Sequence, residues 1–343
     1  MADRQGQPLS EPREPEESVR TEKILPGVWR IRLPLPWPGV PHVNAFAIAS
    51  EGGVVLFDTG MDLPGGFRQL ESGLALAGFE LEDVRLLVCT HSHTDHYGLA
   101  GPIVDRAGCE LWIHPAWGHI RAMVEDPDAA IDRRLEVARQ SGVPAAALDR
   151  YESSRRGSNT GISRLVEPDR ELLPGVVVET DLGPWDVYET PGHAPSHVTL
   201  HQPESRLMIS GDHLLGRISL FFDYGHTPDP VGEFLGGLDA VDGLGTDLCL
   251  AGHGKPFRGI PGKIEANRKL VGDQLGRVRE ALSGEPHTAF ELIPAVLGTT
   301  EVSAMSGVWG LQMALGYIDH LVLAGEAEEV DGEGETRRWR IAA

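Results

Sequence analysis

The sequence predicts an α/β protein in which two β-sheets pack face to face beneath helices, with a helical module at the C-terminal end. Short runs of β-branched and aromatic residues recur from Ile24 to Leu250, and helical stretches separate them. After Pro261 the pattern changes to helices. Because strands occur in both halves of residues 24–261, two sheets covered by helices are the architecture that buries their apolar faces.

The first predicted sheet starts with three strands. V-W-R-I-R-L and V-N-A-F-A-I-A lie between Ile24 and Ser50, and the turn Glu51-Gly52-Gly53 leads into V-V-L-F. Two such runs on either side of a glycine turn predict a hairpin. Residues 66–77 are expected to form a helix, and the apolar run Val84–Cys89 predicts a buried strand.

The remaining predicted elements up to Pro261 are again strands and helices. E-L-W-I-H at 110–114 predicts a strand, and residues 115 to about 156 predict a helical insertion. Further short strands are expected at 176–178, 185–190, 198–201, 207–210 and 247–250. Residues 262–343 predict helices at 263–283, 289–297 and 308–324, followed by a polar hairpin. Three helices and a hairpin indicate a winged-helix-like module.

Composition and charge limit the class of protein. Of 343 residues, 41% are apolar and 24% are charged, as in globular proteins with a sizeable core. The formal net charge of −21 argues against a nucleic-acid partner, because most of the surface would repel a polyanion. No apolar run approaches the roughly 18 residues of a membrane span, so no membrane partner is expected.

The N-terminal segment and the cysteines bear on location. Residues 1–23 are polar and rich in Pro and Glu, which predicts a disordered tail without the apolar core of a secretory signal. Cys89, Cys109 and Cys249 have no paired spacing that would indicate a disulfide framework. A cytoplasmic location is therefore predicted.

A dense histidine cluster follows the predicted strand Val84–Cys89. Residues 89–98 read C-T-H-S-H-T-D-H-Y-G. Imidazole and carboxylate groups suit zinc and other borderline divalent metals. In an extended loop His91 and His93 point the same way and can share one ion, whereas Asp95 and His96 turn towards a neighbouring position. One cluster cannot complete two coordination shells, so distant ligands are needed.

Candidate distant ligands stand at three other strand ends. They are His193 in T-P-G-H, Asp212 in I-S-G-D and His253 in L-A-G-H. Each has a glycine directly before it, which permits a tight turn that aims the side chain over the sheet edge. Four strand ends that carry ligand residues predict a two-metal site.

This ordered set resembles the metallo-β-lactamase superfamily, whose H-x-H-x-D-H signature is complete at positions 91–96. The resemblance runs from about Ile24 to Pro261 and implies an αββα sandwich. By this resemblance, His91, His93 and His193 bind one metal, Asp95, His96 and His253 bind the other, and Asp212 bridges them. It implies two Zn²⁺ per chain, although the ligand types also suit iron or manganese.

The chemistry that the resemblance implies is metal-dependent hydrolysis. Two ions about 3.5–4 Å apart can hold a bridging hydroxide at neutral pH and polarise a carbonyl or phosphoryl oxygen of a substrate. Asp95 is the expected catalytic residue that orients the nucleophile and passes a proton to the leaving group. The sequence contains no G-x-S-x-G, which argues against a serine hydrolase.

Three other residues are assigned roles near the metals. Asp58, in F-D-T-G, matches an early aspartate of the superfamily and is expected to fix the tautomer of a ligand histidine, the alternative being a turn-forming role. His197 is expected either to donate to substrate or to bond the backbone. Tyr224, in L-F-F-D-Y-G-H, is a candidate catalytic residue that would stabilise an oxyanion, or else an aromatic wall of the pocket.

Differences from other branches narrow the activity. The best-known zinc β-lactamases have a cysteine where Asp212 stands, and diiron flavoprotein relatives have a glutamate in place of His93. A dedicated β-lactamase is therefore not expected, and promiscuous β-lactamase activity is kept as a further alternative. The pattern fits the glyoxalase II, lactonase and RNA-processing branches.

The C-terminal module resembles the extension of β-lactamase-like protein 2 relatives, some of which cleave single-stranded RNA. Residues 263–343 contain 8 Lys and Arg against 13 Asp and Glu, which is not the charge of a nucleic-acid-binding face. The module is expected to pack on the catalytic domain, residues 24–261, or to form a homodimer.

The leading hypothesis is a binuclear zinc-dependent hydrolase that cleaves an ester-like bond, a thioester or a lactone, of a small molecule. The alternative enzyme is a metal-dependent single-strand endoribonuclease. A non-catalytic binding protein is the third hypothesis, and the complete ligand set argues against it.

Overall fold

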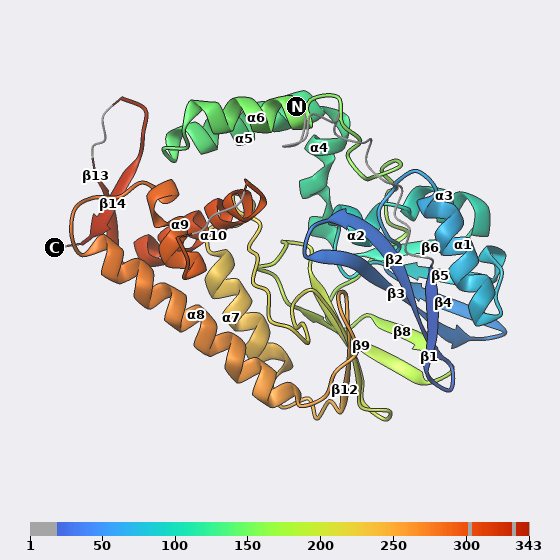
Figure 1. Cartoon of the computed structure of the whole chain (residues 1–343). Coiled ribbons are helices and arrows are strands. Elements are labelled where there is room, and N and C mark those ends of the chain that lie inside the picture. Colours follow the sequence, from blue (N-terminus) through green and yellow to red (C-terminus); the bar gives the residue numbers. More distant parts are fainter. Residues whose placement is uncertain (1–18, 301–303, 331–333, 343) are drawn as a thin grey trace, which may run out of the picture.

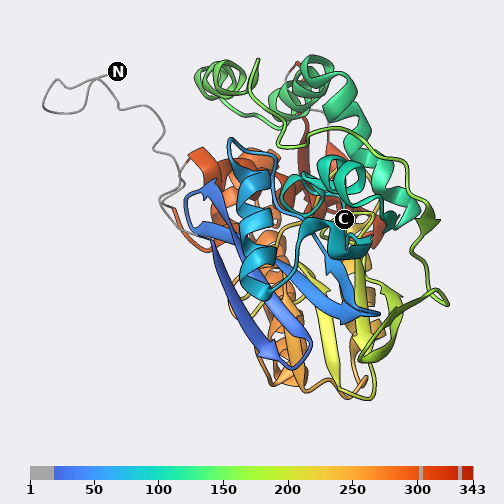
Figure 2. The ribbon, with the colours of Figure 1, turned by 90° about the vertical axis from the view of Figure 1, so that its right-hand side faces the viewer.

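The predicted two-sheet architecture is confirmed by the computed structural model, which describes residues 19–300, 304–330 and 334–342. Two sheets pack against each other, helices cover their outer faces, and the C-terminal helices lie on one side (Figure 1). Turned by 90°, the strands of both sheets run alongside one another, and the insertion lies beyond one of their ends (Figure 2). That end of the sheets carries the histidine cluster.

The first sheet contains seven strands in chain order. They are β1 (Arg20–Leu25), β2 (Val28–Trp37), β3 (Val40–Ser50), β4 (Gly53–Phe57), β5 (Val84–Val88), β6 (Glu110–Ile113) and β7 (Arg170–Glu171). Neighbours are antiparallel from β1 to β4 and parallel from β4 to β7. The β3–β4 hairpin closes through Glu51 and Gly52, whose φ angles of 44° and 79° suit the tight turn.

The boundary of the predicted tail needs a correction. The sequence predicts disorder for residues 20–23, but they belong to β1, which pairs antiparallel with β2. Thr21 also donates from its hydroxyl to the carbonyl of Gly73 at 2.7 Å. The polar composition conceals an edge strand here, because an edge strand exposes most of its side chains. Residues 1–18 lie outside the described residues.

The second sheet contains five strands in the order β12, β11, β10, β9, β8. Their bounds are β8 (Val177–Thr180), β9 (Gly183–Glu189), β10 (Val198–Gln202), β11 (Leu207–Gly211) and β12 (Leu248–Ala251). Only the β11–β12 pair is parallel among these described strands. The core between the sheets includes Phe57 from the first sheet and Trp185 from the second, both fully buried. Their rings lie 5.9 Å apart.

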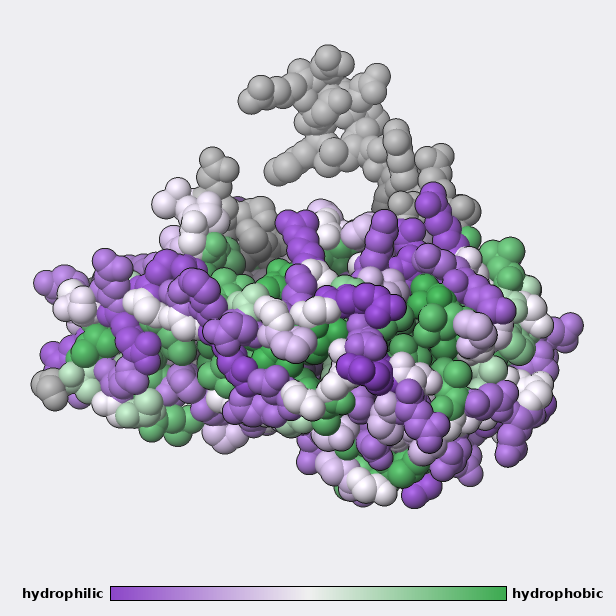
Figure 3. Space-filling view, turned by 90° about the horizontal axis from the view of Figure 1, so that it is seen from below, coloured by the Kyte–Doolittle hydropathy of each residue, from purple (hydrophilic) through white to green (hydrophobic). Residues whose placement is uncertain are grey.

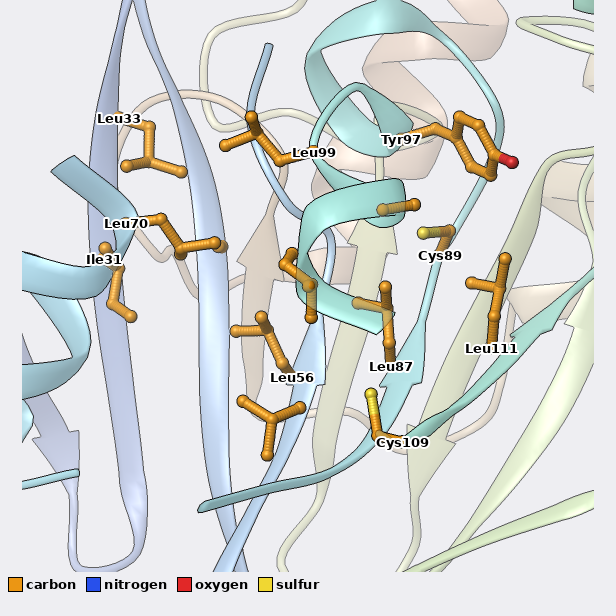
Figure 4. Close-up of a cluster of buried hydrophobic side chains, with 14 of the residues drawn as sticks. Ile31, Leu33, Leu56, Leu70, Leu87, Cys89, Tyr97, Leu99, Cys109 and Leu111 are labelled. Carbon is orange, nitrogen blue, oxygen red and sulfur yellow. The ribbon is translucent and has the colours of Figure 1, made fainter. Parts of the chain in front are cut away.

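Helices cover the outer face of each sheet. The first sheet carries α1 (Gly66–Ala77), the 3₁₀ helix η1 (Leu81–Asp83), α2 (Thr94–Tyr97) and α3 (Ala100–Ala107). Figure 4 shows the cluster beneath them, in which Leu70 lies near Ile31 and Cys89 near Tyr97. The second sheet is covered by α7 (Pro230–Val241), a helix not expected from the sequence, and by α8 (Ile260–Leu282). All three cysteines are buried and free.

The helical insertion is confirmed as a set of short helices. They are η2 (Pro115–Ile120), α4 (Arg121–Glu125), α5 (Pro127–Gln140) and α6 (Ala145–Arg155). The end of α5 contacts the C-terminal module, where the carbonyl of Ser141 accepts from the amide of Phe290 at 3.1 Å and that of Gln140 accepts from Arg337 at 2.8 Å. The insertion therefore follows β6 of the first sheet and is bonded to the module at the end of α5.

The C-terminal module consists of α8, α9 (Ala289–Leu297), α10 (Ala304–Leu323) and the hairpin of β13 (Ala327–Val330) and β14 (Arg338–Ile341). Three helices and a hairpin are the predicted elements, and the winged-helix character of the module stays a prediction. Its apolar side chains share one cluster with Met208 and Cys249 of the second sheet. The module therefore packs on the catalytic domain, as one of its two predicted roles requires.

None of the described helices is both long and apolar enough to cross a bilayer. On the face shown in Figure 3, hydrophilic residues are spread widely, with small apolar groups between them.

Candidate metal centre

The predicted ligands meet at one end of the two sheets because each follows the end of a strand. His91 comes three residues after β5, and α2 then carries Asp95 and His96. His193, Asp212 and His253 follow β9, β11 and β12 respectively. The strand pattern therefore brings together residues that are up to 162 positions apart in the sequence, from position 91 to position 253.

Glycines make room for this convergence. Gly192 and Gly211 have φ angles of 105° and 47°, in the left-handed region predicted for tight turns. Gly252 has a different reason, since a Cβ atom there would lie 2.3 Å from Asp212 Oδ1 and 2.7 Å from the His96 ring. A side chain at position 252 would therefore occupy the ligand cluster itself.

One part of the cluster, which we call the His-rich half, consists of His91, His93 and His193. His93 Nδ1 lies 3.1 Å from His91 Nε2 and 3.0 Å from His193 Nε2. The three ligand atoms fall within 4.8 Å of one another, a spacing that can hold one ion.

The other part, which we call the Asp-containing half, consists of Asp95, His96 and His253. Asp95 Oδ2 lies 3.6 Å from His96 Nε2 and 3.3 Å from His253 Nε2. Asp212 stands between the halves, with one oxygen 3.5 Å from His96 Nε2 and the other 3.6 Å from His193 Nε2. A bridging carboxylate requires this position.

Hydrogen bonds fix which nitrogen of each ligand ring faces the cluster. His93 Nε2 donates to Asp223 at 3.3 Å, and His193 Nδ1 donates to the carbonyl of Phe221 at 3.2 Å. These acceptors hold no proton to give, so the opposite ring nitrogen of each neutral histidine carries a lone pair. That bare nitrogen points into the His-rich half.

In the Asp-containing half, hydrogen bonds again fix which ring nitrogen of each histidine faces the cluster. His96 Nδ1 donates to Asp58 Oδ2 at 2.8 Å, and His253 Nδ1 donates to the carbonyl of His42 at 2.8 Å. The free Nε2 atom of His96 and Oδ1 of Asp212 are buried and have no hydrogen-bond partner among the described residues. Buried polar atoms that face one another without a hydrogen bond are costly unless a cation lies between them, so the donor set fits divalent metal ions.

The two halves differ in the pKa values of their histidines. Burial, and then the charge of His93, lowers the pKa of His193 to about 3, and burial also holds the pKa of His91 far below its usual value. Burial disfavours the charged form of His253 as well, but Asp212 and Asp95 raise its pKa to about 10. His91 and His193 are thus proton-free at neutral pH, while His253 holds a proton that a metal must displace.

Asp58 and His197 both form hydrogen bonds with residues of the ligand cluster. Asp58 accepts from His96 and from the Thr90 hydroxyl, which lies 3.0 Å from His91 Nδ1, so one carboxylate orients a ligand of each half. His197 Nε2 accepts from the amide of Asp212 at 3.0 Å. His197 is only 1% exposed, which favours the backbone-bonding alternative over donation to substrate.

The predicted role of Tyr224 needs a correction. Its ring packs against the cluster of the C-terminal module and interacts with Arg337, and its amide donates to Gln312 Oε1 at 3.0 Å. The side chain therefore contacts the module and not the ligand cluster. This placement argues against the expected oxyanion role.

Sequence reasoning missed three residues next to the ligands. Asp223 accepts from His93, and the Nε2 atoms of His119 and His226 lie 3.6 Å and 3.7 Å from the same Asp223 oxygen. His119 is brought to the centre by η2. The only local signal was the D-Y-G-H spacing of Asp223 and His226.

Comparison with known proteins agrees with the geometry of the centre. Residues 38–253 match the family model described as the Metallo-beta-lactamase superfamily. That match covers more than half of the chain and includes all of the predicted ligands, and the chain belongs to this superfamily.

Relatives share more than the catalytic domain. The probable metallo-hydrolase YqjP of Bacillus subtilis (strain 168) is 26% identical over 290 residues, which cover 81% of this chain and 87% of that protein. The crystal structure of a Beta-lactamase domain protein from Burkholderia ambifaria is similar with a TM-score of 0.77 and 27% identity, covering 94% of this chain and 93% of the other. A metallo-beta-lactamase family protein from Thermus thermophilus shares the fold, with a TM-score of 0.78, 24% identity and coverage of 93% and 100%.

Proposed function

We propose that the chain is a hydrolase with two divalent metal ions, zinc in the first place, that cleaves a thioester or lactone bond of a small molecule. The proposal rests on the convergence of histidine ring nitrogens and two carboxylates in two halves that share Asp212. When bound there, two ions supply Lewis acidity and lower the pKa of water, so hydrolysis needs no serine or cysteine nucleophile.

The residues of the chain supply orientation and proton transfer. Asp95 is buried and its Oδ2 lies 3.3 Å from His253 Nε2, so the second carboxylate oxygen is available to accept a proton beside the centre. Asp58 and the carbonyls of Phe221 and His42 hold the ligand rings in one tautomer each. The ligand geometry is therefore set before a substrate arrives, which reduces reorganisation during the reaction.

The identity of residue 212 and the charge of the protein support an ester-like substrate. An aspartate bridges the halves, where the well-known zinc β-lactamases have a cysteine. The net charge of −21 is unfavourable for an RNA substrate, whose phosphates would be repelled during approach. A cytoplasmic location and a homodimer through the module remain predictions.

A panel of substrates tests the proposal. The zinc-loaded full chain is assayed with thioesters, lactones, a β-lactam and a single-stranded RNA, and the first two are expected to be hydrolysed at least about tenfold faster than the β-lactam. Cleavage of RNA without cleavage of thioesters or lactones would overturn the proposal in favour of the endoribonuclease. Binding of two metals with no turnover of any substrate would favour a binding protein.

A further inference from the structure

A second group of metal-ligand side chains adjoins the His-rich half, and two of its members, His119 and His226, have no part in the proposed hydrolysis. Asp223 lies in the loop between β11 and α7, and three imidazole Nε2 atoms approach its Oδ2 atom. The distances are 3.3 Å for His93, 3.6 Å for His119 and 3.7 Å for His226. His119 comes from η2, so the group joins the insertion to the loop that backs the His-rich half.

His119 and Asp223 face each other with two hydrogen-bond acceptors and no donor between them. His119 Nδ1 donates to the carbonyl of Ala116 at 3.0 Å, so Nε2 of the neutral ring carries a lone pair. That atom has no hydrogen-bond partner among the described residues, and the side chain is only 7% exposed. A buried lone pair aimed at a carboxylate oxygen is unfavourable unless a cation lies between the two atoms.

The distance between His119 and Asp223 is that of two ligands around one ion, and the ligand atoms of His93, His119 and Asp223 lie within 4.8 Å of one another. A separation of 3.6 Å is too long for a charge-assisted hydrogen bond, which spans about 2.7–2.9 Å. Two ligands bonded at about 2.0–2.2 Å to one tetrahedral ion are separated by about 3.4 Å. The ring centroids of His119 and His226 lie 5.0 Å apart.

We propose that His119, Asp223 and His226 form a third divalent-cation site, distinct from the two-metal centre and of the His/carboxylate type that suits Zn²⁺. His226 is 34% exposed and completes the site from the solvent side, which gives an ion a path of entry. The Asp223 oxygen also accepts from His93, which a carboxylate can do while it binds an ion. An ion there ties η2 of the insertion to the loop that orients His93.

Counting metal equivalents in matched variants tests the site. The metal-free full chain is equilibrated with Zn²⁺, and the bound metal is measured for the wild type, His119→Gln and His226→Gln. His287→Gln is the control, because that histidine lies in the C-terminal module and bonds the carbonyl of Glu285. The wild type and the control are expected to bind one equivalent more than either variant, whatever number the two-metal centre holds.

Equal stoichiometry of the wild type and either variant would overturn the site as assigned. Thermal unfolding gives a second readout, since an ion that ties two segments of the folded chain stabilises it by mass action. Zn²⁺ beyond two equivalents is expected to raise the Tm of the wild type by a few degrees and to leave that of His226→Gln unchanged. Identical Tm increases in both proteins would contradict the proposal, and the exposed position of His226 keeps this variant foldable.

Discussion

The His-rich half and the Asp-containing half of the centre lie side by side, but different parts of the molecule hold them. In the Asp-containing half, His96 is oriented by Asp58 at the end of β4, and His253 by a backbone carbonyl of β3. In the His-rich half, the acceptors for His93 and His193 are Asp223 and the carbonyl of Phe221. The two acceptors of the Asp-containing half lie in, or directly after, strands of the first sheet. The two acceptors of the His-rich half lie in the loop between β11 and α7.

The C-terminal module holds that loop in place. Phe222 packs against Tyr317 of α10 with 5.6 Å between ring centroids, and Gln312 of α10 accepts from the amide of Tyr224. His320 of the same helix pairs with Asp229 at 3.0 Å. The module therefore acts on one half of the centre through the orientation of two ligand rings, while the other half depends on the sandwich alone.

Replacing Asp212 should have the largest effect, because it is the one ligand that both halves share. Asp212→Ala is expected to lose both metals and to lower hydrolysis by at least about a thousandfold, since the ions contribute several kcal/mol of charge stabilisation. Metal analysis and steady-state kinetics measure this. The exposed Asp186→Ala serves as the control, and retention of both metals by Asp212→Ala would contradict the bridging role.

Removing a ligand from one half at a time should show that each half binds its own metal ion. His193→Ala and His253→Ala are each expected to lose one of the two metals and to lower turnover about a hundredfold, as a centre with one ion lacks one of its two charge-stabilising contacts. The metal content of each variant gives the answer. If either variant lost both ions, the halves would not be separable units.

The halves should also differ in how metal binding depends on pH. His253 has its pKa raised to about 10 and is protonated at neutral pH, so an ion must displace that proton, and affinity increases as pH rises. His193, with its pKa lowered to about 3, is already proton-free above pH 5. From pH 6 to 8, Zn²⁺ affinity should increase at least about tenfold per unit in His193→Ala, which keeps the Asp-containing half, and less steeply in His253→Ala. An equal pH dependence of Zn²⁺ affinity in the two variants would contradict this difference between the halves.

Asp58→Asn should weaken the Asp-containing half by loss of orientation. Its carboxylate fixes the tautomer of His96, and such partners typically contribute about 10–100-fold in metal affinity. Metal affinity is compared in the His193→Ala background, where the remaining ion reports on this half. A change of less than about threefold would show that Thr90 and the backbone suffice to orient the rings.

The smallest effect is expected from Gln312→Ala, which removes the hydrogen bond from the module to the loop at Tyr224. A single hydrogen bond contributes about 1 kcal/mol, so the affinity of the His-rich half should fall about fivefold and that of the Asp-containing half should not change. Competition with a chelator measures both. A larger effect on the Asp-containing half would refute the proposed division of support.

Part of this centre could be predicted from the sequence because the signals are local. His91, His93, Asp95 and His96 fall within one short strand-to-helix connection, and glycine before each distant ligand marks a turn at a strand end. The helix Gly66–Ala77 and the hairpin at Glu51-Gly52 were likewise set by periodicity and turn chemistry.

The rest depended on tertiary packing that no local pattern records. Tyr224 and Asp223 are neighbours in the chain, yet Asp223 contacts His93 while Tyr224 contacts the module. His119 reaches the centre only because the insertion folds back over the sheet end. The strand β1 was concealed by its exposed, polar side chains.

The most direct test of the two-half centre is anomalous X-ray diffraction from crystals of the zinc-loaded full chain. We expect one zinc peak about 2.0–2.1 Å from His193 Nε2 and a second at the same distance from His253 Nε2, with Asp212 between them. Density for a single ion, or for no ion at either position, would contradict the two-half centre.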